Sequence, residues 1–124
     1  MSMSDYLENK VLAHVLGTVT YTSPGSVYLA LHSADTLETG SNELTGGTYA
    51  RQLCAFGAAA SGSIANANQE DFTLLPAGDV KYAGIWDGST AGNFLWGGAL
   101  TATKSVSLGD TVTINAGSVV VTLD

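Results

Sequence analysis

The chain has 124 residues, of which 45% are hydrophobic and only 12% are charged, so its composition is that of one globular domain and excludes a disordered segment. Four Lys and Arg residues stand against eleven Asp and Glu residues, and the formal net charge is −7. Because nucleic acids and anionic membrane surfaces are bound through clustered cations, this balance argues against both as partners.

The N-terminal segment carries the signals of a helix. Ser4 is a favourable N-cap, Asp5 and Glu8 place negative charge in the first turn, and Gly17 is a natural stop. The same two carboxylates occupy the region where a signal peptide would be basic, so we predict none. These positions predict one helix over residues 4–17.

This predicted helix is amphipathic. Leu7, Val11 and Val15 recur at four-residue spacing, and Leu12 and Leu16 lie beside them on one broad apolar stripe. A helix of three to four turns is marginal in isolation, so the stripe must pack against another surface. That surface is either the chain's own domain or a neighbouring subunit, and in the second case Leu7, Val11 and Val15 form the candidate partner interface.

The rest of the chain, residues 26–124, has the alternating pattern of a β domain. Short segments rich in β-branched and aromatic residues predict strands over 27–32, 80–86, 94–100, 105–108, 111–115 and 118–123. Turn formers separate them, notably at 87–88, 108–110 and 115–117. Residues 35–47 form a polar loop, and residues 56–68 are either a loop or a weak strand.

Many short strands with close turns and no alternating long helices predict a mainly β fold. We expect one domain over residues 1–124, an antiparallel β-sandwich or small, jelly-roll-like barrel with one N-terminal amphipathic helix. Cys54 is the only cysteine, so no intrachain disulfide can form. Its apolar neighbours predict a buried structural thiol.

No catalytic constellation emerges from the sequence. His14 and His32 lack ligands at zinc-site spacing, and Cys54 has no histidine nearby in the chain. Neither a nucleophile elbow nor a phosphate-binding loop is present. We therefore predict no enzyme activity, no catalytic or metal-binding residue and no cofactor.

Two groups of carboxylates are candidates for acid pairs or calcium ligands. They are Glu70 with Asp71, and Asp35 with Glu38 and Glu43. The first pair starts a predicted strand, and the second group lies in a loop without a calcium-loop pattern. A solvated acidic surface is the favoured interpretation, with weak calcium binding as the alternative.

Three aromatic residues cluster around the loop at 87–93. Trp86, Phe94 and Trp96 stand near the tips of two neighbouring predicted strands. If exposed, their rings form a candidate receptor or sugar contact, because aromatic faces stack on sugar rings. The alternative, which their phase with apolar neighbours favours, is that they belong to the core.

Segments along nearly the whole chain resemble a family of small structural proteins of tailed bacteriophages. They are YLENKVL (6–12), VYLALHSAD (27–35), ELTGGTYAR (43–51), GIWD (84–87) and the closing stretch from GGALT (97–101) to residue 118. Members of this family are usually labelled tail-fibre or minor structural proteins. The resemblance implies a virion protein made in the host cytoplasm, and it carries over no catalytic residue.

Two roles fit this resemblance. The favoured one is a capsid decoration or cement protein that binds the major capsid protein on the outer shell and stabilises capsomer contacts. The alternative is a component of a tail fibre or receptor-binding tip, although the sequence has no shaft-forming repeat. Partners would be the major capsid protein or other virion proteins, together with further copies of the chain in a dimer or trimer. Arg51 is either an interface residue or a member of a buried ion pair.

Overall fold

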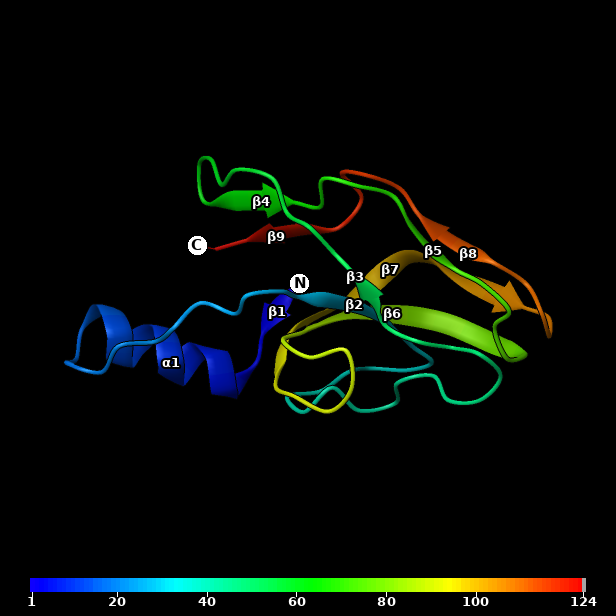
Figure 1. Cartoon of the computed structure of the whole chain (residues 1–124), viewed down its shortest axis with the longest axis horizontal. Helices are drawn as coiled ribbons and strands as arrows, with labels where there is room; N and C mark the ends of the chain where they lie inside the picture. The colour runs from blue at the N-terminus through cyan, green and yellow to red at the C-terminus, as the bar shows by residue number, and fades with distance from the viewer. Residues whose placement is uncertain (124) are drawn as a thin grey trace.

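A five-stranded antiparallel sheet and two small two-stranded sheets make up most of the regular secondary structure (Figure 1). The structure is a computed structural model that describes residues 1–123. The sheets are β1-β7-β6-β2-β3, β4-β9 and β5-β8, and every strand pair is antiparallel. The elements are β1 (Ser2–Met3), α1 (Asp5–Val15), β2 (Tyr28–His32), β3 (Gln52–Leu53), β4 (Ser63–Ala65), β5 (Glu70–Phe72), β6 (Gly78–Trp86), β7 (Phe94–Val106), β8 (Val112–Ile114) and β9 (Val120–Thr122).

The mainly β, antiparallel fold with one short N-terminal helix is confirmed, and it is consistent with a small β-sandwich. The two small sheets lie over one side of the five-stranded sheet (Figure 1). Buried side chains from both layers form one apolar core, because strand residues that face inward alternate with residues that face water. Its largest fully buried apolar members are Phe72, Leu29, Leu31, Leu75, Ile85, Leu95 and Val80.

The hairpin of β6 and β7 is the centre of the large sheet. The sequence predicts two strands, over 94–100 and 105–108, but the structure has the single strand β7, which ends at Val106. Val80 pairs with Lys104 and Tyr82 pairs with Ala99, so β7 has extra residues opposite Lys81. This bulge keeps the backbone paired on both sides of a local irregularity.

The predicted helix is confirmed, and its cap explains where it starts. The Ser4 hydroxyl oxygen accepts a hydrogen bond from the Leu7 amide at 3.3 Å and donates one to the Phe94 carbonyl at 2.6 Å. The helix ends at Val15, with Leu16 as its C-cap and Gly17 following. The buried cap therefore fixes the helix to the start of β7.

Only the first half of α1 packs on the domain. Leu7 is buried and Val11 is half-buried, whereas Leu12, Val15 and Leu16 are exposed. Figure 1 shows the helix extending away from the large sheet, at the same end of the molecule as β4 and β9. Within residues 1–123, no helix combines the length and the apolar character needed to cross a bilayer.

Candidate functional site

Arg51 is the centre of a polar cluster beside the loop at residues 87–93. Its Nε and Nη2 atoms each donate a 2.8 Å hydrogen bond to the carboxylate of Glu43. Its Nη1 atom donates to the carbonyl oxygens of Gly88, at 2.8 Å, and Ala91, at 2.7 Å. The guanidinium carbon lies 3.8 Å from the ring centroid of Trp86, and only 7% of the side chain is exposed. Of the two interpretations of Arg51, the structure therefore shows the buried ion pair.

Tyr49 connects this pair to the large sheet. Its hydroxyl donates to Glu43 Oε1 and accepts from the Leu31 amide, both at 3.0 Å. Burial raises the pKa of Tyr49, so the hydroxyl remains a donor at neutral pH. Burial acts to raise the pKa of Glu43 as well, but the contacts with Arg51 and Tyr49 outweigh burial and lower it. The cluster thus holds a permanent charge pair that fastens the loop at 87–93 to β2.

The candidate calcium ligands Asp35, Glu38 and Glu43 form hydrogen bonds with different partners. Asp35 accepts a hydrogen bond from the Leu37 amide at 2.9 Å, and Glu38 accepts one from the Asp5 amide at 2.9 Å. Glu43 is engaged by Arg51. Nowhere in residues 1–123 do three His, Cys, Asp or Glu side chains gather in a way that could hold a metal ion. Asp35 therefore caps a local backbone turn and Glu38 the N-terminus of α1, whereas Glu43 belongs to the ion pair.

The aromatic cluster around the loop lies mostly inside the protein. Trp86 and Phe94 are buried, with ring centroids 5.3 Å apart and planes tilted by 59°. Trp96 is half-buried and lines a groove described below. A stacking surface for sugars needs exposed rings, and Trp86 and Phe94 do not offer one. Sequence phase had already favoured the core for these residues.

The four residues of the candidate partner interface also differ in how far their side chains are exposed. Leu7 belongs to the core and Arg51 to the ion pair, and little of either side chain is exposed. Val11 is half-buried, and Val15 is 68% exposed. Of these four residues, Val15 offers the largest free surface.

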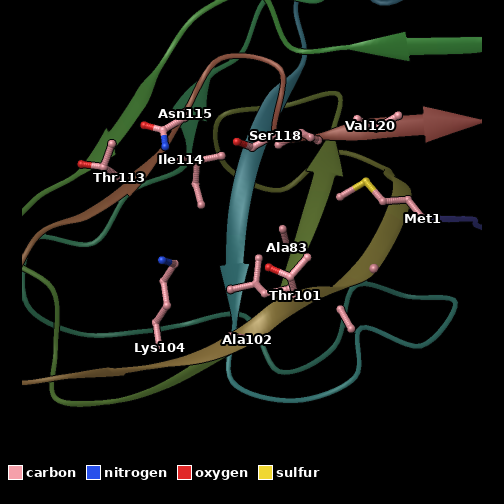
Figure 2. A pocket seen from close by; sticks show the side chains of 14 residues that line it. Met1, Ala83, Thr101, Ala102, Lys104, Thr113, Ile114, Asn115, Ser118 and Val120 are labelled. Carbon is pink, nitrogen blue, oxygen red and sulfur yellow. The ribbon is translucent and has the colours of Figure 1, made fainter.

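A mixed polar and apolar pocket lies between β7 and the segment from β8 to β9 (Figure 2). Its volume is about 310 Å³, and Figure 2 shows Lys104, Thr101, Asn115 and Ser118 among the side chains around it. Lys104 is the only residue with an ionisable side chain among the described residues that line it. The pocket therefore offers hydrogen-bonding groups, without a pair of side chains for acid–base chemistry.

His32 is the most buried polar side chain in the large sheet. Its Nδ1 atom lies 2.8 Å from the Ser41 carbonyl and donates to it, whereas Nε2 has no partner among the described residues. The ring meets Phe94 edge-on, with centroids 6.3 Å apart. Burial lowers the pKa of His32, and the nearby Arg51 charge acts in the same direction.

We expect protonation of His32 to destabilise the fold at acidic pH. In the unfolded chain the imidazole has an ordinary pKa of about 6.5, so below that pH the unfolded state binds more protons than the folded state. The contribution to stability is complete above pH 6.5 and is lost as the pH falls towards the lowered folded pKa. Urea unfolding at several pH values between 5 and 8 measures this loss.

His32→Gln should flatten the acid limb of this profile, and His14→Gln is the matched control. His14 is exposed in the last turn of α1, and its Nδ1 atom accepts a hydrogen bond from the Tyr21 amide. A profile with the same slope in the His32→Gln variant and the wild type would contradict the assignment.

Cys54 is a buried thiol, as the sequence predicted. Its side chain is buried, and burial together with the Glu70 charge raises its pKa to about 11. A reagent that reacts with thiolates should therefore modify the native protein at least about 100-fold more slowly than the urea-unfolded protein at pH 8. Absorbance of released thionitrobenzoate measures both rates, and equal rates would show that Cys54 is accessible.

Comparison with known proteins identifies the family of the chain, which the geometry of the site does not. The profile of a family described as "Podophage GP4 fiber I protein gp80" matches residues 2–122. No curated protein matches the chain. The match includes α1 and every strand, so it covers the whole fold described above. The chain therefore belongs to the podophage fibre I protein family, a family of tailed-phage virion structural proteins.

Proposed function

We propose that the protein is a non-enzymatic structural component of a phage fibre. The observation that carries this proposal is the family match over residues 2–122. A fibre component needs a rigid body and surfaces that join other virion proteins, and it needs no reaction centre. The partners in this proposal are neighbouring proteins of the virion.

The hydrogen bonds that hold the loop at 87–93 support a load-bearing role. Arg51 joins the loop at 87–93 to Glu43, and its guanidinium stacks on the face of Trp86. Within the loop, Asp87 accepts hydrogen bonds from the backbone and side-chain nitrogens of Asn93, at 2.6 and 2.8 Å. A loop held by charged hydrogen bonds at its base and its tip keeps one shape, which favours repeated contacts with a partner.

A capsid decoration protein that binds the major capsid protein is the second candidate. One observation favours it over a fibre: the sequence contains no heptad, collagen-like triplet or β-helix period from which a shaft is built. The two candidates differ in copy number and in their position on the virion.

The test is the copy number of this protein in purified virions, measured on a quantitative gel against the major capsid protein, with gold-labelled antibodies in electron micrographs. Few copies with label at the tail support the fibre proposal. A copy number near that of the capsid protein, with label over the shell, overturns it in favour of decoration. Absence from washed virions overturns both candidates.

A further inference from the structure

An apolar groove runs between α1 and the small sheet of β4 and β9. It consists of two adjoining cavities of about 580 and 310 Å³ that share Val27, Phe56, Ile64 and Trp96 as lining residues. The larger cavity is bounded by the helix, and the smaller one by β9. Residues of α1, β4 and β9 line these cavities, and Figure 1 shows these three elements at the same end of the molecule.

No charged side chain of the described chain lines this groove. The sequence explains why, because residues 11–34 and residues 52–69 contain no Asp, Glu, Lys or Arg. These two runs supply most of both walls, and all fifteen charged residues lie outside them. The groove is therefore a neutral, apolar surface on a protein with a net charge of −7.

The exposed half of α1 provides a matching apolar projection beside the groove. Leu12 is 56% exposed, Val15 is 68% exposed and Leu16 is 79% exposed. The helix cannot fold down into its own groove, because the Ser4 cap and the buried Leu7 fix its first turn to the domain. Exposed apolar side chains beside an apolar groove favour this end of the molecule as an interaction site.

We propose that the occupant of this groove is the α1 helix of a second copy, in a reciprocal dimer with two-fold symmetry. A groove and an apolar projection at the same end of one molecule can satisfy each other in two copies related by a two-fold axis. The charge distribution favours this surface for self-association. Two copies with a net charge of −7 repel each other, and this repulsion is weakest where both present a neutral face. The dimer does not depend on whether the protein belongs to a fibre or to the shell.

The first measurement is the mass of the full-length protein by sedimentation equilibrium between about 1 and 200 μM. We expect twice the chain mass at the upper concentrations, with dissociation on dilution. A mass equal to one chain throughout overturns the proposal and leaves the groove to a different virion protein. A trimer overturns the two-fold arrangement.

Two variants test the contact, one on each side of it. Leu16→Lys changes the projection and Ala59→Lys changes the groove wall, and each should raise the dissociation constant at least about tenfold, because a lysine would lose its water in an apolar contact. Leu108→Lys is the matched control, since Leu108 is 78% exposed in the turn between β7 and β8. Both changed residues are exposed, and circular dichroism checks that the variants fold. If neither Leu16→Lys nor Ala59→Lys changes the dissociation constant of the dimer, the proposed contact is wrong.

Discussion

Arg51→Met should destabilise the fold by about 3–5 kcal/mol, the usual cost of removing one partner from a buried ion pair. The variant removes four hydrogen bonds and, among residues 1–123, leaves the Glu43 carboxylate with only the Tyr49 hydroxyl as a donor. The free energy of unfolding from urea titration at pH 7 measures the effect. Lys104→Met is the control, because Lys104 is an exposed cation for which the structure shows no ion pair in residues 1–123, and its change should stay within about 0.5 kcal/mol.

A double-mutant cycle separates the ion pair from the loop contacts. Glu43→Gln alone removes the charge partner, whereas Arg51→Met with Glu43→Gln removes both charges. If the pair dominates, the double variant should be less destabilised than the sum of the two single variants. Full additivity would mean that the bonds to Gly88 and Ala91 carry the effect.

Gly97→Ala should destabilise the protein by about 3 kcal/mol, at the upper end of the cost of overpacking a core. A Cβ atom at this position would lie 2.1 Å from Thr36 Oγ1 and 2.7 Å from the tip of the Phe94 ring. Gly97 pairs with Gly84 across β6 and β7, where a Cβ would likewise lie 2.5 Å from His32 Nε2. This glycine pair therefore makes the space in which the side chains of His32, Thr36 and Phe94 fit.

Gly25→Ala is the matched control for this substitution. No atom lies within 4 Å of a Cβ added at Gly25, and its φ lies outside the left-handed region. Thermal and urea unfolding should show no loss of stability for this variant, and at most a small gain from reduced freedom of the unfolded chain. A Gly97→Ala variant as stable as Gly25→Ala would mean that the strands separate at little cost.

The sequence was most informative where local chemistry decides the structure. The cap at Ser4 and the stop before Gly17 gave the helix to within two residues at each end. The predicted turns at 108–110 and 115–117 hold Gly109 and Gly117 at positive φ, which favours glycine. The strand start at Glu70 is β5, and alternation located β2 and β6.

The remaining elements depend on contacts between distant segments. The two-residue strands β1 and β3 have too few residues for a period, and their partners decide whether they form at all. The partner of Arg51 could not be predicted for the same reason, since seven residues of loop lie between Arg51 and Glu43. The groove was missed because its walls come from α1, the segment at 21–27, β4 and β9, which only the fold brings together. The charge-free runs at 11–34 and 52–69 were the signal that could have located it.

The pairing of β1 with β7 has a consequence for how the protein folds. Met3 pairs with Trp96, and the hydroxyl that caps α1 bonds to a carbonyl ninety residues later. During synthesis on a ribosome, the helix emerges first but has no docking site until β7 has left the exit tunnel. Ordering such remote contacts is slow, and domains rich in them fold in roughly milliseconds to seconds. Until then the apolar stripe of the helix is exposed, so aggregation competes with folding most strongly during translation.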